Sequence, residues 1–293
     1  MAKFVFSAFA DEAGSSLDEQ IEALVANGIH YIEPRNIGGK SIIDFNDDEL
    51  IEIRERLAAN GIKVGSVGSP IGKYPITDDF DSYLPKVKRT IEIAKILGTK
   101  YIRMFSFFVK QDELAQYRDE VIRRLKVMVE LAESEGVILC HENESAIYGQ
   151  MPAQVKDLLT SVPGLGGIFD AANYRMNDAD TMEGIGATLI NFKYMHIKDA
   201  IFGTKTIVPA GEGEGRIGDV LDVVNGHTDG EVYLTLEPHL HAFLAYKQID
   251  SHELRGAYSF ANGREAFDFA VKALEKLLTK HGYGKDENGI WKK

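Results

Sequence analysis

The amino-acid sequence predicts one α/β domain, a (β/α)8 TIM barrel. Eight short apolar runs alternate with longer amphipathic stretches along the whole chain, as repeated βα units on a parallel sheet would require. The length of 293 residues is one at which α/β barrels commonly fold as a single unit. The first apolar run leads into Asp11 and Glu12, whereas a doubly wound open sheet would normally show a glycine-rich turn there. The barrel is therefore the predicted architecture.

The apolar runs predict the eight strands, and the stretches between them predict the helices. The runs are residues 4–9, 30–33, 63–67, 100–105, 137–142, 167–170, 192–197 and 231–237. An apolar spacing of 3.6 residues that ends at Gly predicts helices at 17–28, 48–61, 83–98, 117–136 and 263–282. Shorter amphipathic stretches predict helices at 152–161, 181–189 and 217–226.

The end of the chain and one long connection fall outside this repeating pattern. We expect residues 1–284 to form the barrel and residues 285–293 to be a polar tail that frays, unless Trp291 docks on a neighbouring surface. Residues 239–263, after the eighth strand, are too many for an ordinary connection. They predict a lid or a subunit contact, and a homo-oligomer is compatible with the sequence.

The composition excludes several classes of partner. The 45 Asp and Glu residues outnumber the 33 Lys and Arg residues, and the formal charge of −12 would repel a nucleic acid at long range. No apolar run approaches the ~20 residues needed to span a bilayer, and acidic residues come too early for a signal peptide. The one cysteine, Cys140, cannot form an internal disulfide. We expect a soluble, cytoplasmic protein that binds neither nucleic acid nor membrane.

Four consecutive predicted strands each end in a side chain that can bind a metal ion. The sequences VILCHENE, GIFDAAN, YMHIKDA and YLTLEPH place Glu142, Asp170, His196 and Glu237 where the apolar runs end. The carboxyl ends of barrel strands face a common mouth, so these side chains are expected to meet there. Three carboxylates and an imidazole suit Mn²⁺, Mg²⁺ or Co²⁺, and Zn²⁺ is also compatible. Glu144 shares the inward face of Glu142 but lies beyond the strand, so Glu142 is preferred as the ligand. Any one of these residues alone would more commonly form an ion pair, but together they predict one divalent metal site.

The same strand ends resemble those of the xylose isomerase-like barrel superfamily, the sugar phosphate isomerase/epimerase group, over nearly the whole chain. The motifs CHENE, FDAANY, HIKDA and LEPH carry the resemblance, and SAFADE, IEPRN and PAGEGEGRI are less specific. The resemblance implies a metal bound by Glu142, Asp170, His196 and Glu237, with the two glutamates doubling as acid and base. Endonuclease IV enzymes share this fold but use three zinc ions and extra histidines, and here Asn173 stands where one such histidine would be. An endonuclease IV-like hydrolase is therefore a distant alternative.

Such a site suits proton transfer at the carbon next to a sugar carbonyl. That chemistry needs a base, an acid and a cation that stabilises the enediolate. Glu142 and Glu237 come from different strands and can serve opposite faces of a substrate bound beside the metal. We therefore predict a metal-dependent isomerase or epimerase of a ketose, an aldose or a related keto-polyol. A metal-dependent dehydratase (a lyase) of a cyclic polyol would use the same groups and is the main alternative, and a non-catalytic sugar-binding barrel is a more distant one.

Other polar residues near the strand ends are candidate substrate contacts, namely Glu33, Lys198, Arg216 and His239. Each has a structural alternative: Lys198 can be a solvated rim residue, Arg216 can form a surface ion pair, and Glu33 can pair with a nearby arginine. A histidine in a loop, such as His239, is more often structural. Asp199 next to Lys198 favours a charged lysine, so a Schiff-base mechanism is not expected.

The loop after the seventh strand indicates the class of substrate. Barrels often bind a substrate phosphate with the backbone N–H groups of the loops after strands seven and eight. Here the seventh loop carries Glu212 and Glu214, whose charges would repel a dianion. We therefore expect an unphosphorylated sugar or polyol.

Overall fold

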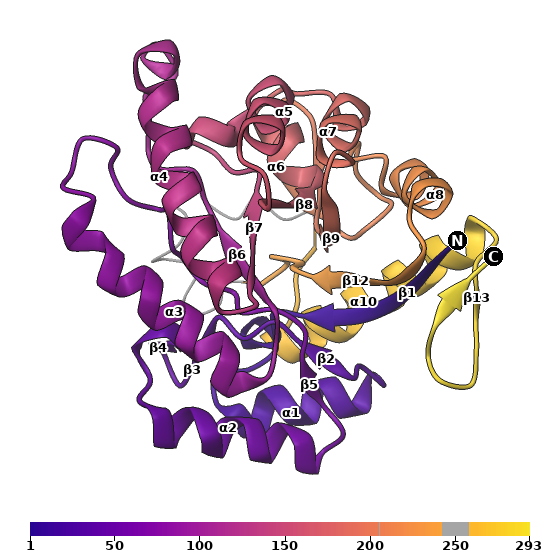
Figure 1. Ribbon diagram of the computed structural model, residues 1–293. Coiled ribbons are helices and arrows are strands. Elements are labelled where there is room, and N and C mark those ends of the chain that lie inside the picture. Colours follow the sequence, from indigo (N-terminus) through magenta and orange to yellow (C-terminus); the bar gives the residue numbers. More distant parts are fainter. Residues whose placement is uncertain (205, 242–257) are drawn as a thin grey trace.

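The computed structural model describes residues 1–204, 206–241 and 258–293, and it shows a closed barrel of parallel strands surrounded by helices (Figure 1). The barrel strands are β1 (Ala2–Ala8), β2 (Tyr31–Ile32), β5 (Lys63–Val64), β6 (Tyr101–Met104), β7 (Ile138–Glu142), β8 (Gly166–Asp170), β9 (Phe192–Ile197) and β12 (Gly230–Leu236). Each of them overlaps one of the eight apolar runs of the sequence. The predicted (β/α)8 architecture is therefore confirmed.

Continuous parallel ladders and individual backbone hydrogen bonds together close the ring of strands. Regular parallel pairing runs from β1 through β12, β9, β8 and β7 to β6, whereas β2 and β5 pair only with each other in the ladders. Individual backbone hydrogen bonds join this short pair to the rest. The amide of Glu33 donates to the carbonyl of Ala8 at 3.0 Å, and the amide of Val67 donates to the carbonyl of Tyr101 at 2.9 Å. The barrel is therefore closed, and β2 and β5 are joined to β1 and β6 by individual backbone hydrogen bonds rather than by ladders.

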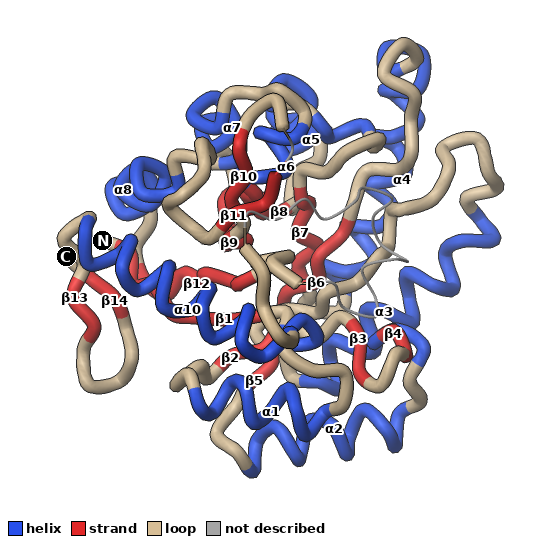
Figure 2. The backbone as a smooth tube through the Cα atoms, turned by 180° about the vertical axis from the view of Figure 1, so that it is seen from behind, coloured by secondary structure: helices blue, strands red, loops and turns tan. Residues whose placement is uncertain are grey.

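The helices cover the outside of the strands, as the two opposite views show (Figures 1 and 2). The eight that follow the barrel strands are α1 (Leu17–Ala26), α2 (Asp47–Ala59), α3 (Leu84–Leu97), α4 (Leu114–Ser134), α5 (Pro152–Ser161), α7 (Thr181–Thr188), α8 (Ile217–His227) and α10 (Gly263–Lys280). Local sequence sets their ends. Ser16 and Asn46 form capping boxes with the glutamates three residues later, and α3 ends at Gly98 with φ of +76°.

Short elements that the sequence did not predict lie in the loops after the strands. They include α6 (Ala171–Met176), the hairpin β3 (Asn36–Ile37) and β4 (Lys40–Ser41), and the hairpin β10 (Asp199–Ile201) and β11 (Thr206–Val208). These loops form the face of a barrel that usually carries the active site. Of the expected lid or subunit contact at 239–263, residues 242–257 lie outside the described residues.

Alternation along the strands sends one set of side chains into the barrel. Cys140, Ile168 and Tyr194 form a small buried cluster there, separate from the larger apolar core. Each of these residues lies two positions before a strand-end residue, so the strand-end side chain points the same way. The packed interior therefore lies directly beneath the predicted metal ligands.

The last residues of the chain form a hairpin rather than a frayed tail, and Trp291 docks on a neighbouring surface, which was the other expectation for this segment. Strands β13 (Gly284–Lys285) and β14 (Trp291–Lys292) are antiparallel, and Trp291 pairs with Phe4 of β1. The indole of Trp291 is buried and stacks on Phe6, with ring centroids 6.0 Å apart. The hairpin projects beside β1 in both views (Figures 1 and 2). It covers the edge of β1 near the amino end of that strand.

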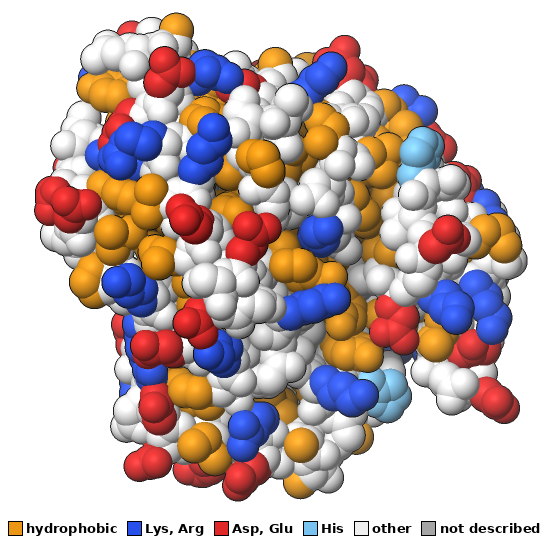
Figure 3. Space-filling model, viewed as in Figure 1, with side chains coloured by type: hydrophobic (Ala, Val, Ile, Leu, Met, Phe, Trp, Pro, Cys, Tyr) orange, Lys and Arg blue, Asp and Glu red, His pale blue; other side chains and the backbone are white. Residues whose placement is uncertain are grey.

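The surface shows no single concentration of charge on the face drawn in Figure 3, where acidic and basic side chains are interspersed. On this face the acidic side chains are therefore not gathered in a patch. Across the part of the chain that the structure describes, no helix combines the length and the apolar character needed to cross a membrane.

We expect Trp291→Ala to lower the free energy of unfolding by about 3 kcal/mol or more, because a buried aromatic side chain is lost from the edge of β1. Phe269→Ala, at a position that is 37% exposed on α10, is the control and should cost less. Urea unfolding followed by circular dichroism measures both. Equal losses in the two variants would contradict the docking of Trp291.

Candidate metal centre

The four predicted ligands lie together at the mouth of the barrel. Glu142 and Asp170 end β7 and β8, His196 lies in β9, and Glu237 directly follows β12. Ligand atoms from all four lie within 4.8 Å of one another, and all four side chains are buried. The parallel register places Asp170 opposite His196 and so holds these two at one level. The structure thus brings together side chains that are up to 95 positions apart in sequence, from Glu142 to Glu237.

The donor atoms of this group fit a divalent cation. Oδ2 of Asp170 and Oε2 of Glu237 are buried and accept no well-aligned hydrogen bond from the described residues, although each forms an ion pair with Lys198. A buried carboxylate oxygen without a donor is costly, and neighbouring carboxylates add repulsion. A cation held by Glu142, Asp170, His196 and Glu237 would remove both costs. These four residues are therefore the ones that would hold a metal.

The surroundings of the four ligands are acidic. The buried, connected carboxyl groups are those of Asp11, Glu12, Glu33, Glu142, Asp170 and Glu237, and the permanent cations are Arg35, Arg103 and Lys198. Arg35 donates to Glu237 at 3.0 Å, and Arg103 donates to Glu142 at 3.2 Å. Carboxyl groups therefore outnumber permanent cations in this cluster, which again favours a bound cation.

The ionisation of the carboxyl groups differs with their neighbours. Burial raises the pKa of Asp170 to about 6, although Lys198 acts against this rise. Burial also acts on Glu142, but the positive charges of His196 and Arg103 outweigh it and lower the pKa of Glu142 to about 2. Glu142 is therefore held as a carboxylate.

Lys198 lies at the edge of the ligand group. Its Nζ is 3.1 Å from Oδ2 of Asp170 and 3.6 Å from Oε2 of Glu237. Burial lowers the pKa of the ammonium group, but these carboxylates outweigh burial and raise the pKa well above its ordinary value. Lys198 is therefore charged, which opposes a Schiff-base role and leaves it able to donate hydrogen bonds.

Glu33 lies behind His196 rather than in open contact with the mouth. Nδ1 of His196 faces Glu142 at 3.0 Å, and Nε2 lies 3.3 Å from Oε2 of Glu33. The other oxygen of Glu33 accepts from the hydroxyl of Tyr194 at 3.0 Å. Both carboxylate oxygens are thus used inside the protein. Although the sequence suggested a substrate contact, this position suits a carboxylate that orients a metal-binding histidine.

The other two predicted substrate contacts lie in different settings. His239 is buried, and its Nε2 is 3.3 Å from Oε1 of Glu237 and 3.4 Å from Oε1 of Glu12. It therefore borders the ligand group. Arg216 instead pairs with Asp219 at 2.8 Å, and its side chain is 53% exposed. Arg216 thus shows the surface ion pair that was its structural alternative.

Several buried polar residues complete the site without having been assigned a role from the sequence. Asp11 and Glu12 follow β1 and accept from Arg35. Asn173 donates from Nδ2 to Oε1 of Glu142 at 3.3 Å and from its backbone amide to Oδ1 of Asp170 at 2.8 Å. The sequence feature that could have identified Asp11 and Glu12 is their position, because they follow a strand just as the ligands do.

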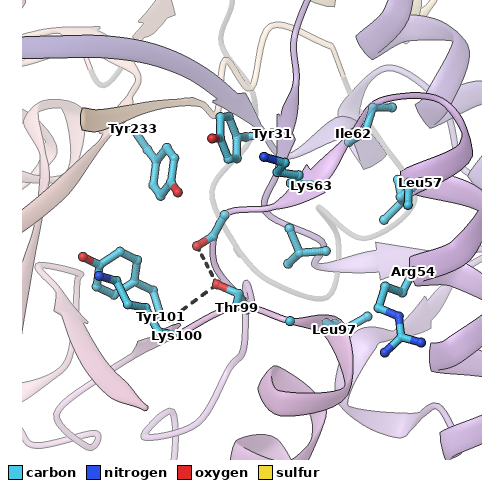
Figure 4. Close-up of a pocket in the computed structure, with 14 residues that line it drawn as sticks. Tyr31, Arg54, Leu57, Ile62, Lys63, Leu97, Thr99, Lys100, Tyr101 and Tyr233 are labelled. Atoms are coloured by element: carbon cyan, nitrogen blue, oxygen red, sulfur yellow. Dashed lines mark hydrogen bonds between the residues drawn. The ribbon is translucent and has the colours of Figure 1, made fainter. Parts of the chain in front are cut away.

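Two cavities lie at opposite ends of the barrel. One of about 330 Å³ opens at the amino ends of β2, β5 and β6, where Tyr31, Tyr101 and Tyr233 line it (Figure 4). None of the candidate metal ligands lines this cavity. A second cavity of about 400 Å³ is lined by Arg35 and Arg103, which bind Glu237 and Glu142. The second cavity therefore adjoins the metal centre.

Comparison with known proteins gives a family match. The sequence profile of the xylose isomerase-like TIM barrel family matches residues 21–248. No curated protein matches the chain.

Solved structures with the same fold include three of interest. The chain is similar to the IOLI protein with a binding zinc atom, at 18% identity over 95% of this chain and 99% of that one, with a TM-score of 0.71. It is similar to D-psicose 3-epimerase, at 17% identity over 95% and 99% of the two chains, with a TM-score of 0.70. It is also similar to the probable 3-DHS dehydratase AsbF from Bacillus anthracis, at 14% identity over 94% and 99%, with a TM-score of 0.69. At these identities the likeness shows the fold.

We expect the chain to bind one Mn²⁺ ion, and His196→Ala to weaken this binding while the barrel stays folded, because mouth residues do not support the packed layers beneath them. Calorimetric titration with Mn²⁺ and circular dichroism measure the two effects. His227→Ala, on the exposed end of α8, is the control. Full Mn²⁺ affinity in His196→Ala would place the ion elsewhere.

Glu33→Gln should weaken Mn²⁺ binding about 10- to 100-fold, as is typical when the outer partner of a metal-binding histidine is lost. Glu144→Gln is the matched control, because Glu144 pairs with Lys73 at 3.2 Å and lies outside the ligand group. The same titration reads both variants. Unchanged Mn²⁺ affinity in Glu33→Gln would return Glu33 to the role of a substrate contact.

Proposed function

Since the chain belongs to the xylose isomerase-like TIM barrel family, we propose that it is a metal-dependent isomerase or epimerase of a sugar or keto-polyol. The observation that carries the proposal is the buried group of Glu142, Asp170, His196 and Glu237, in which two carboxylate oxygens accept no well-aligned hydrogen bond from the described residues. Mn²⁺, Mg²⁺ or Co²⁺ suits these ligands, and Zn²⁺ is compatible.

The proposed chemistry is proton transfer at a carbon next to a carbonyl. A divalent cation in this site would supply stabilisation of the negative charge that develops on substrate oxygens. Glu142 and Glu237 come from β7 and from the end of β12, which are separated in the barrel by β8 and β9. One glutamate removes the proton and the other returns it from the other side.

Neighbouring cations prepare these glutamates for their roles. Arg103 and Arg35 fix one oxygen of Glu142 and of Glu237, respectively. These contacts hold the orientation of both groups, so each carboxylate lies at a defined position. Lys198 is charged and lies beside Asp170, so it can donate a hydrogen bond to a substrate oxygen. In this proposal Lys198 binds substrate, and Glu33 and His239 orient His196 and Glu237.

A metal-dependent dehydratase of a cyclic polyol is the second candidate. It would need the same base and the same cation, with loss of a hydroxide instead of return of the proton. A specific observation favours it, since one structure of the same fold is that of a probable 3-DHS dehydratase. The two candidates differ in whether water leaves the substrate.

Incubation in D₂O distinguishes them. Protein loaded with Mn²⁺ is mixed with a panel of unphosphorylated ketoses, aldoses and keto-polyols, and products are followed by NMR and mass spectrometry. Deuterium uptake without loss of water supports the isomerase or epimerase. Loss of water supports the dehydratase, and neither reaction across the panel would contradict both.

Glu142→Gln and Glu237→Gln should each slow the reaction found in that panel by roughly 10²- to 10⁴-fold, because a general acid or base is lost while its size is kept. Mn²⁺ affinity should fall less steeply, since an amide oxygen can still bind the ion. Glu144→Gln is again the control. Wild-type turnover in either variant with the ion bound would remove that glutamate from the mechanism.

A further inference from the structure

The loop after β9, the seventh strand of the barrel, is built like an anion-binding loop. Barrels commonly bind a substrate phosphate with backbone amides at this position. In this chain the sequence GEGEG occupies residues 211–215, shortly after the hairpin of β10 and β11. Consecutive amides in such a glycine-rich turn form a concave site for an anion.

A carboxylate of the protein itself binds these amides. Oδ2 of Asp199 accepts from the amides of Gly211 at 2.9 Å and Gly213 at 3.1 Å. Oδ1 accepts from the amides of Gly215 at 2.9 Å and Ala200 at 2.9 Å. Asp199 therefore has four backbone donors, the number of hydrogen bonds that two carboxylate oxygens usually accept.

The amides between these glycines are also bonded. The amide of Glu212 donates to the carbonyl of Pro209 at 3.0 Å, and the amide of Glu214 donates to the carbonyl of Ala200 at 2.9 Å. Every amide from 211 to 215 thus has an acceptor inside the protein. None of these five amides is therefore left for a substrate phosphate.

The loop fits Asp199 closely and adjoins the metal centre. Asp199 is buried, and a Cβ atom added at Gly213 or Gly215 would lie 2.3 Å or 2.6 Å from its Oδ1. Glycine is needed at both positions so that the backbone can reach the carboxylate. A Cβ at Gly215 would also lie 3.0 Å from that of Ala171, the residue after the ligand Asp170.

We propose that Asp199 is a built-in anion that occupies the phosphate position of this loop and so determines that the site takes an unphosphorylated substrate. The part of this inference that concerns the substrate rests on the proposed function. The binding of the loop amides by Asp199 does not. Burial raises the pKa of Asp199, and its backbone donors act against that rise because they stabilise the ionised form.

Asp199 is a better physical reason for this selectivity than the glutamates of the same loop. Glu212 and Glu214 are exposed, so water and salt screen their charges. Asp199 is buried at the point where a phosphate would have to bind, and there a second anion meets both the repulsion of a charge and the loss of its donors.

Inorganic phosphate tests this inference. Asp199→Ala should lower the thermal midpoint by roughly 5 °C or more, because four backbone amides, two of them in buried hydrogen bonds, lose their acceptor. Sodium phosphate at millimolar concentration, compared with chloride at the same ionic strength, should restore several degrees in this variant. In the wild type the same change of salt should have little effect. Stabilisation of the wild type that equals that of the variant would overturn the proposal.

Two further measurements guard against a variant that does not fold. Asp286→Ala, which removes a carboxylate that caps the amides of Asn288 and Ile290 in an exposed turn, should show no phosphate response beyond that of the wild type. In the wild type, hydrogen exchange at Gly211, Gly213 and Gly215 should be slow for a loop. Exchange there at unprotected rates would overturn the proposal without any variant.

Both readouts are independent of turnover. Failure of the D₂O panel would therefore contradict the proposed function and leave the role of Asp199 in the loop standing. A phosphate response of the wild type would contradict the role of Asp199 and leave the proposed function standing.

Discussion

The close approach of three buried carboxylates, those of Glu142, Asp170 and Glu237, is the constraint on which the rest of the site depends. Like charges at this distance in a buried position repel strongly and lose hydration. The structure offsets part of this cost with Arg35, Arg103 and Lys198, all of them buried. Oxygens of Asp170 and Glu237 still accept no well-aligned hydrogen bond from the described residues, which is the physical reason to infer a cation there.

The barrel meets this constraint by placing different supports on different sides of the mouth. On one side, residues that follow β1 and β2 form an ion-pair network in which Arg35 joins Asp11 to Glu237. Beneath His196, hydrogen bonds link His196 to Glu33 and Glu33 to Tyr194, and they connect the metal site to the packed interior of the barrel. On the side of β9, Asp199 fixes the loop that follows the strand. Each support uses a residue just beyond a strand end, where inward parity brings side chains together.

Some features could not have been found by reading segments one at a time. The pairing of Trp291 with Phe4 joins opposite ends of the chain. The local polarity of residues 285–293 could not show this contact and by itself suggested a frayed tail. Glu33 has the same strand-end position as a substrate contact would have, and only its distances to His196 and Tyr194 show what its oxygens bind. Arg216 was open to two interpretations; the structure shows its ion pair with Asp219, and its contact with a substrate stays a prediction.

The sequence by itself determined the eight strands, the helices between them and the set of four ligand-type residues. The reason is that period-two and 3.6-residue patterns are local, and in a barrel the end of each strand leads to one shared mouth. Only the tertiary structure decided which partners those residues have. Hydrogen bonds such as Tyr194 to Glu33 and Gly215 to Asp199 span 161 and 16 positions, and they depend on the register and twist of the closed barrel rather than on any local pattern.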